Sequence, residues 1–205
     1  MDADAFARRV GDRLIHVTLI ENLAGIKRHG LLRPTRLAQM CGVSADEIAP
    51  RNKAIVLQAN GFSARLNHQK PLLAGRNQVP AFLDGHTLQS WAQQLDERVF
   101  FWPQRRGQAF AASLQDRGAQ AVFELDSRRF FEAFADNVYL SPINSGSAMR
   151  RASPRGDWIY VPVLAGWEAF ATNRQQRGLT RTRDSVVEVS LRSDVPAPVL
   201  TDCLR

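Results

Sequence analysis

Cysteine is scarce in this 205-residue chain, and the familiar metal and nucleotide motifs are missing from it. The two cysteines, Cys41 and Cys203, lie far apart in the sequence, so they form neither a disulfide framework nor the paired spacing of a zinc site. The sequence holds no CxxC, HExxH or GxxxxGKS/T motif. It therefore argues against zinc-finger, metalloprotease and P-loop chemistry, and we expect a site without a metal ion.

Long apolar runs are also missing. No stretch approaches the ~20 apolar residues that a membrane helix needs. The first ten residues, MDADAFARRV, lack the apolar core of a signal peptide. We therefore expect a cytoplasmic protein with no membrane partner.

Acidic residues are outnumbered by basic ones. The chain carries 27 Lys and Arg against 20 Asp and Glu, which gives a net charge of +7 and a pI of about 10.4, and the excess is nearly all arginine. Because guanidinium groups bind phosphate in a bidentate manner and stack on bases, this composition indicates a nucleic-acid or nucleotide partner. The alternative is a solvated basic surface that binds nothing.

Short strands and helices alternate along the chain, and its length favours a single domain over residues 1–205. About six short strands with scattered helices predict an α+β domain, although their order does not show which strands pair. Residues 31–98 are weakly patterned and are interpreted as an insertion or helical-loop region, with 60–85 mostly loop. The other predicted elements are helices over 3–13 (Phe6 and Val10 inward), 86–97, 104–117 (Phe110 inward), 127–135 and 167–176, and strands over 99–102, 121–125, 138–140 and 158–163.

Residues 14–31, LIHVTLIENLAGIKRHGL, predict a strand followed directly by a capped helix. The apolar run 14–17 has the length of a strand, and Thr18 and Glu21 have the spacing of a capping box. Gly30 suits the end of the helix. His16 then lies beside a helix N-terminus, a place suited to an anionic or hydroxyl-rich ligand. The alternative is that His16 is a structural histidine with its hydrogen bonds satisfied.

A glutamate occupies the middle of the last predicted strand, 186–191. Its side chain shares a face with Val186 and Ser190, while the other face is apolar. An unpaired carboxylate is costly to bury, so either this face is exposed to solvent or Glu188 lines a cleft in which its charge is used.

Arginines flank two of the predicted strands. Arg105 and Arg106 follow the aromatic strand 99–102, either at the edge of a site or as ordinary surface residues of a helix start. Arg177, Arg181 and Arg183 lie shortly before Glu188 and would suit a phosphate backbone, the alternative being a basic loop without a partner.

Taken in order, these residues resemble the DarT-type ADP-ribosyltransferases. The opening His16-Val17-Thr18, Asn22-Leu23, Ile26 and Gly30-Leu31 is similar to the start of that family, and to the start of a family of uncharacterised small bacterial proteins with a VFFW-type strand. The run from Phe100 to Arg105 resembles the family's aromatic strand with a following arginine. The strand around Glu188, followed by Val195-Pro196, resembles the strand that holds the family's catalytic glutamate.

The resemblance implies an ADP-ribosyltransferase-like fold, with a split β-sheet core, peripheral helices, and NAD+ as co-substrate in the cleft between two small sheets. It also implies roles for individual residues. Glu188 would be the catalytic carboxylate; Arg105, or Arg106 with a shift of one residue, would hold the diphosphate or the acceptor; His16, Thr18, Asn22, Gly30 and Phe101 would form the NAD+ site; and Arg177, Arg181 and Arg183 would bind the acceptor.

The resemblance therefore predicts an enzyme, an NAD+-dependent mono-ADP-ribosyltransferase, with a toxin or defence role and an antitoxin or immunity protein as a partner. The net charge favours nucleic acid (DNA or RNA) over protein as the acceptor. Two rivals share the fold: an RNA 2′-phosphotransferase, and a catalytically inactive module that binds nucleic acid.

Overall fold

The computed structural model describes the chain except for residues 60, 75–78, 114–118, 150–152, 178–184 and 205 and the side chains of 79, 80, 174 and 176. Its described part holds a six-stranded sheet in the order β5-β1-β4-β8-β6-β7, with antiparallel pairs throughout, and a two-stranded hairpin. The strands are β1 (Arg13–Leu19), β2 (Ile55–Ala59), β3 (Phe62–Leu66), β4 (Val99–Pro103), β5 (Gln120–Asp126), β6 (Val138–Ser141), β7 (Val161–Pro162) and β8 (Glu188–Leu191). The predicted α+β class is confirmed.

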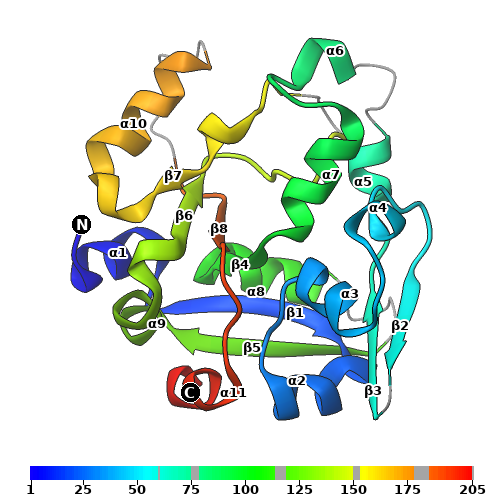
Figure 1. Cartoon of the computed structure of the whole chain (residues 1–205). Helices are drawn as coiled ribbons and strands as arrows, with labels where there is room; N and C mark the ends of the chain where they lie inside the picture. Colours follow the sequence, from blue (N-terminus) through cyan, green and yellow to red (C-terminus); the bar gives the residue numbers. More distant parts are fainter. Residues whose placement is uncertain (60, 75–78, 114–118, 150–152, 178–184, 205) are drawn as a thin grey trace.

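Helices pack around this sheet (Figure 1). They are α1 (Ala3–Val10), α2 (Leu23–His29), α3 (Pro34–Met40), α4 (Ala45–Ile48), α5 (Lys70–Leu73), α6 (Val79–Phe82), α7 (Leu88–Asp96), α8 (Gln104–Ala112), α9 (Ser127–Phe134), α10 (Gly166–Gln176) and α11 (Ala197–Cys203). Short 3₁₀ turns are η1 (Ile20–Asn22), η3 (Ala135–Asn137), η4 (Asp157–Ile159) and η5 (Val163–Ala165). Within the described ranges, no helix has both the length and the apolar character to cross a membrane.

Strand β4 joins two halves of the sheet that run in different directions. Its C-terminal end pairs with β1 at two positions, Leu14 with Pro103 and Ile15 with Trp102, and its N-terminal end pairs with β8. Figure 1 shows β1 and β5 crossing the lower part of the molecule, whereas β6 and β8 run upward from it. Because the pairing stops at Ile15, the part of β1 that follows it separates from β4.

The main hydrophobic core lies on the face of the sheet that carries Phe101. Helices α1, α9 and α11 cover this face, and the expectation that Phe6 and Val10 point inward is confirmed. Each large apolar side chain that is fully buried contributes roughly 1.5–3 kcal/mol. The buried members of this core include Phe6 and Val10 of α1, Leu14 of β1, Val99 and Phe101 of β4, Phe130 and Phe131 of α9, Val189 and Leu191 of β8, and Leu200 of α11.

The opposite face is covered by different segments in the two halves of the sheet. Over β4, β6 and β8, helix α7 forms a second apolar cluster with Leu72, Phe82, Ala148, Ile159 and Tyr160. The rings of Trp91 and Tyr160 stack in it with centroids 5.8 Å apart. Over β1, helix α8 approaches so closely that a Cβ at Gly107 would overlap the side chain of Ile15. The expectation that Phe110 points inward is wrong, because Gly107 takes the face toward β1 and Phe110 packs on Trp102 at the surface, 37% exposed.

Residues 31–98 are more structured than the sequence predicted. The prediction of mostly loop over 60–85 is wrong, because β3 pairs with β2 at five positions and helices α5 and α6 follow within the same range. Helices α3 and α4 pack against this hairpin through a small cluster of Ala38, Ile48, Leu57 and Leu66. At the start of this region, the backbone of Leu31 pairs with that of Val195 through hydrogen bonds of 3.0 and 2.9 Å.

The strand-to-helix junction after His16 differs from the prediction. Strand β1 continues to Leu19, so Thr18 lies inside the strand and does not cap a helix. Glu21 forms an ion pair with Arg65 of the hairpin instead (3.2 Å). Helix α2 begins only after η1 and ends at Gly30 as predicted, with φ of 89°. The predicted strand 158–163 is also wrong over most of its length, since β7 covers two residues between 3₁₀ turns.

Candidate functional site

His16 lies at the point where β1 and β4 separate. Its Nδ1 atom is 2.9 Å from the carbonyl oxygen of Phe100, which can only accept a hydrogen bond, so Nδ1 carries a proton. Burial lowers the pKa of His16, and the bond to Phe100 opposes that shift only in part. The imidazole is therefore neutral at pH 7, and its Nε2 atom is a hydrogen-bond acceptor.

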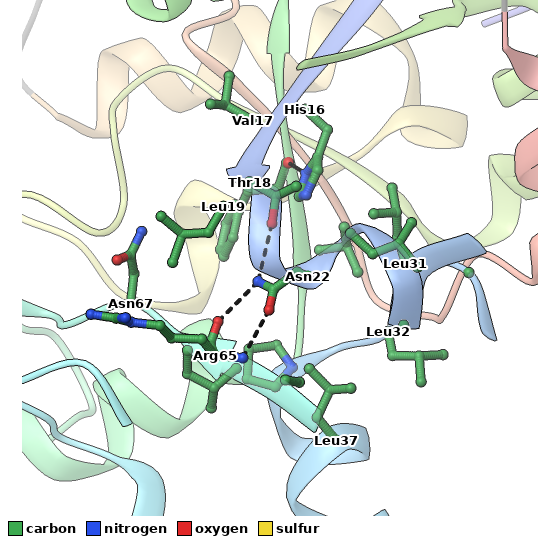
Figure 2. Close-up of a pocket in the computed structure, with 18 of the residues that line it drawn as sticks. His16, Val17, Thr18, Leu19, Asn22, Leu31, Leu32, Leu37, Arg65 and Asn67 are labelled. Carbon is green, nitrogen blue, oxygen red and sulfur yellow. Dashed lines mark hydrogen bonds between the residues drawn. The ribbon is translucent and has the colours of Figure 1, made fainter. Parts of the chain in front are cut away.

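A cavity of about 270 Å³ opens beside His16 (Figure 2). It is lined by residues 16–19 and Asn22 from β1 and η1, by residues of α2 and the chain after it up to Leu37, by Arg51 and 62–67, and by 98–100 and Trp102 around β4. We call this space the β1–β4 cavity. Since β3 and Arg51 form one of its walls, the region interpreted as an insertion contributes directly to the candidate site.

The Asn22 side chain connects the β2–β3 hairpin to the β1 side of the cavity through hydrogen bonds. Its side-chain amide donates to the carbonyl oxygen of Arg65 (3.0 Å) and accepts from the backbone N–H of Arg65 (2.8 Å), as Figure 2 shows. The same amide donates to the hydroxyl oxygen of Thr18 (3.3 Å). The Thr18 hydroxyl thus accepts one bond and keeps its own proton to donate to a ligand.

Of the two remaining residues predicted for the NAD+ site, Gly30 lines the cavity, whereas Phe101 is buried in the main core. Gly30 lines the β1–β4 cavity at the end of α2, and a Cβ there would overlap the carbonyl oxygen of Val195, so the close approach requires glycine. Phe101 is fully buried in the main core, with its ring 5.6 Å from that of His16. Phe101 therefore packs against His16 from the main core and does not line the cavity. Its neighbours Phe100 and Trp102 do.

Glu188 is buried, which rules out the exposed face considered from sequence. The residue is 4% exposed, and its carboxyl group accepts a 2.6 Å hydrogen bond from the Ser145 hydroxyl. Burial raises the pKa of Glu188 to about 7; the bonds from Ser145 and the positive charges of Arg98 and Arg155 lower it by less. The group thus changes charge near neutral pH.

Glu188 is one strand away from the β1–β4 cavity. Phe100 of β4 pairs with Ser190 of β8, and opposite residues of an antiparallel pair share a face. Because side chains alternate along a strand, Glu188 lies on the same face as Phe100 and Trp102. Phe100 and Trp102 are among the residues that line the cavity, whereas Glu188 is not.

A turn that carries Ser145 covers Glu188, and a buried arginine holds this turn. The Arg155 guanidinium donates to the backbone carbonyls of Asn144, Ser145 and Ser147 at 2.9–3.3 Å, and the Trp91 indole also donates to Ser145. Arg155 is 1% exposed. The sequence analysis does not identify Arg155, because the carbonyls it binds are placed around it only by the fold.

Arg98 is a second residue that the sequence reasoning missed. It is buried, lines the β1–β4 cavity, and donates a long bond to the Ser190 hydroxyl (3.4 Å). Its guanidinium lies over the rings of Tyr139 and Tyr160, 4.7 and 3.8 Å from their centroids. Burial lowers the pKa of Arg98. Arg98 thus contacts the cavity and also acts electrostatically on Glu188.

The remaining predicted site residues lie away from the β1–β4 cavity. Arg105 and Arg106 are exposed at the start of α8 and line a different cavity. Arg177 is half-buried just after α10. Arg181 and Arg183 lie outside the described residues. His16, Thr18, Asn22 and Gly30 are therefore brought together at the β1–β4 cavity, whereas Glu188 lies outside this group on β8, on the far side of β4 from β1.

Acidic, histidine and cysteine side chains do not gather into a metal-binding group of three or more within the described part of the chain. No curated protein matches the sequence. Residues 12–200 match the model of a family of unknown function, DUF7002. Because this match covers most of the sequence, the chain belongs to the DUF7002 family.

Proposed function

We propose that this protein is an NAD+-dependent mono-ADP-ribosyltransferase whose β1–β4 cavity holds the nicotinamide and its ribose. The observation that carries the proposal is His16, a neutral imidazole fixed by Phe100 where the two halves of the sheet separate. Its Nε2 atom would accept from a ribose hydroxyl, and the Thr18 hydroxyl would donate to the same sugar or to the amide. The rings of Phe100 and Trp102 offer apolar surface for a planar ring.

Glu188 is the candidate for the chemical step. Breaking the bond between nicotinamide and ribose C1′ leaves the electron pair on nicotinamide and builds positive charge on the sugar. A carboxylate near the ribose would stabilise that charge, and it or a neighbouring group would take the proton that the acceptor loses when its bond to C1′ forms. A pKa of about 7 suits proton uptake at neutral pH.

The ligand would have to extend over Phe100 and Trp102 to reach Glu188. These residues share a face of the sheet with Glu188, and Arg98 lies close to both the cavity and the carboxyl group. The acceptor is proposed to be nucleic acid because of the net charge of +7. The proposal rests on this arrangement together with the resemblance to the DarT-type enzymes.

One observation favours a second candidate, a binding module of the same architecture without catalysis. Glu188 does not line the cavity, and its carboxyl group is engaged by Ser145. A protein that only binds a nucleotide would keep His16 and Asn22 and would not need Glu188 at the ligand.

Nicotinamide release from NAD+ by the purified protein separates the two candidates. We expect release that increases with added single-stranded DNA, RNA or lysate protein, and that is lost in Glu188→Gln, which keeps the shape of the side chain and removes its charge. His16→Ala should weaken NAD+ binding. Glu132→Gln, at an exposed position on α9, is the matched control and should behave as wild type.

Two results would contradict the proposed mechanism. Undiminished release by Glu188→Gln would remove Glu188 from the chemical step. NAD+ binding that depends on His16, without nicotinamide release under any condition, would support the binding module.

A further inference from the structure

A second cavity, of about 630 Å³, lies between the end of α1, the start of α8 and the chain that leads into β8. Its polar lining comes from Arg9, Gln104, Arg105, Arg106, Gln108 and Ser185, and we call it the α1–α8 groove. The three arginines come from two helices that meet where Gly11 contacts Gln104, since a Cβ at Gly11 would overlap the Gln104 side chain. The groove is separate from the β1–β4 cavity and shares no lining residue with it.

The groove has an uncompensated positive charge. Arg9, Arg105 and Arg106 are exposed, and no carboxylate of the described residues is in the lining. In the described part of the chain these three arginines form no ion pair, whereas Arg128 on α9 pairs with two aspartates. Arg9 stacks on the ring of Trp167 (3.7 Å to the centroid), and Arg106 donates to the Ser185 hydroxyl (3.2 Å). These contacts orient two guanidinium groups and leave their charge unpaired.

We infer that the α1–α8 groove binds the phosphate backbone of a nucleic acid. Guanidinium forks match phosphate oxygens in a bidentate geometry, and the amides of Gln104 and Gln108 add neutral donors. A lipid surface fits less well, because the groove is concave and no large exposed apolar side chain is among its lining residues. The inference concerns binding only and does not depend on what the β1–β4 cavity holds.

The groove and the β1–β4 cavity lie near each other at the end of β4. Trp102 lines the cavity, and the next residue, Pro103, lines the groove. A strand bound along the groove would therefore pass close to the opening of the cavity. If the proposed transferase activity holds, this strand is its acceptor, and Arg105 contacts the acceptor rather than the diphosphate.

The test measures the affinity of the full chain for labelled 20-nucleotide single-stranded DNA and RNA and for a duplex, by fluorescence anisotropy at several salt concentrations and without NAD+. The double variant Arg105→Glu/Arg106→Glu should raise the Kd about tenfold or more and reduce the salt slope by about 1 to 2. The neutral variant Arg105→Gln/Arg106→Gln should weaken binding less than the charge reversal. Circular dichroism establishes that both variants are folded.

A matched control distinguishes binding in the groove from the non-specific attraction between a basic protein and nucleic acid. Arg28→Glu/Arg36→Glu makes the same change in net charge at exposed positions on α2 and α3 and should have a much smaller effect. Equal weakening by the two charge-reversed variants would overturn the inference, as would unchanged binding in the groove variant. Binding to phosphatidylserine-containing vesicles, with none to nucleic acid, would assign the groove to a membrane surface instead. Because NAD+ is absent, these results are independent of the nicotinamide-release assay.

Discussion

The buried carboxyl group of Glu188 should make the stability of this protein fall as the pH rises toward 7. The folded protein holds a proton on Glu188 up to a pKa of about 7, whereas the ordinary pKa of a glutamate side chain is 4.5. Between these two values the folded state binds more protons than the unfolded state, so the free energy of unfolding decreases with increasing pH. A shift of this size corresponds to about 3 kcal/mol across the window, to order of magnitude.

Glu188→Gln removes this titration and keeps a side chain that resembles the protonated acid. Relative to this variant, wild type should therefore lose about 3 kcal/mol of stability between pH 4 and pH 8. For a chain of this length that difference corresponds to roughly 6–12 °C in Tm. Other ionisable groups contribute equally to both proteins and cancel in the comparison.

Urea unfolding at pH intervals from 4 to 8 measures the difference directly. Glu132→Gln controls for the loss of one negative charge at an exposed site and should follow wild type at every pH. A difference between wild type and Glu188→Gln that stays constant from pH 4 to pH 8 would refute the reasoning, because it would mean that Glu188 does not hold its proton in the folded state. Ser145→Ala should enlarge the loss of stability between low and high pH. The Ser145 hydrogen bond is one of the contacts that lower the pKa of Glu188, so its removal raises that pKa further.

Three other substitutions test the packing around the site. Gly107→Ala would force α8 away from Ile15 and should lower the free energy of unfolding by about 1–3 kcal/mol in urea denaturation. Gly30→Ala combines a φ of 89° with an overlap on the Val195 carbonyl and should lower Tm further than Gly107→Ala. Asn22→Ala breaks two hydrogen bonds to the backbone of β3, and hydrogen exchange should be faster in β3 with α9 unchanged.

Elements with strong local signals could be predicted from the sequence. The helix predicted over 86–97 is α7, which begins after Thr87 and buries Trp91 and Leu95. The glycine after the basic turn of α2 ends that helix as expected. In these cases the information is local, because caps, glycine and helical periodicity act within a few residues of the chain.

The hairpin β2–β3 was missed although its signal is present. The sequence reads IVLQANGFSARL, in which Asn60-Gly61 is flanked by strand-forming runs, and an Asn-Gly pair is a strong hairpin indicator. Over the whole of 60–85, the prolines, glycines and asparagines outweigh this short pattern. The omission mattered, because β3 forms a wall of the β1–β4 cavity.

The surroundings of Glu188 could not be predicted in the same way. Alternation along the strand showed that its two faces differ, but all four residues of β8 are buried. Ser145, which donates a hydrogen bond to Glu188, lies 43 residues earlier in the sequence. Which residues meet across such a separation is decided by the pairing of β6 with β8, which a single sequence does not show.

The position of the arginine near the site follows from the two-residue period of a strand. The resemblance pointed to Arg105, which comes after Pro103 and so belongs to helix α8, where its side chain is exposed. Arg98 precedes the same strand and stands two residues before Phe100, in step with the face that carries Phe100 and Trp102. Arg98 therefore lies beside the cavity and interacts electrostatically with Glu188, whereas Arg105 on helix α8 lines the α1–α8 groove. The two arginines are thus suited to two different anions, a nucleotide in the cavity and a phosphate backbone in the groove.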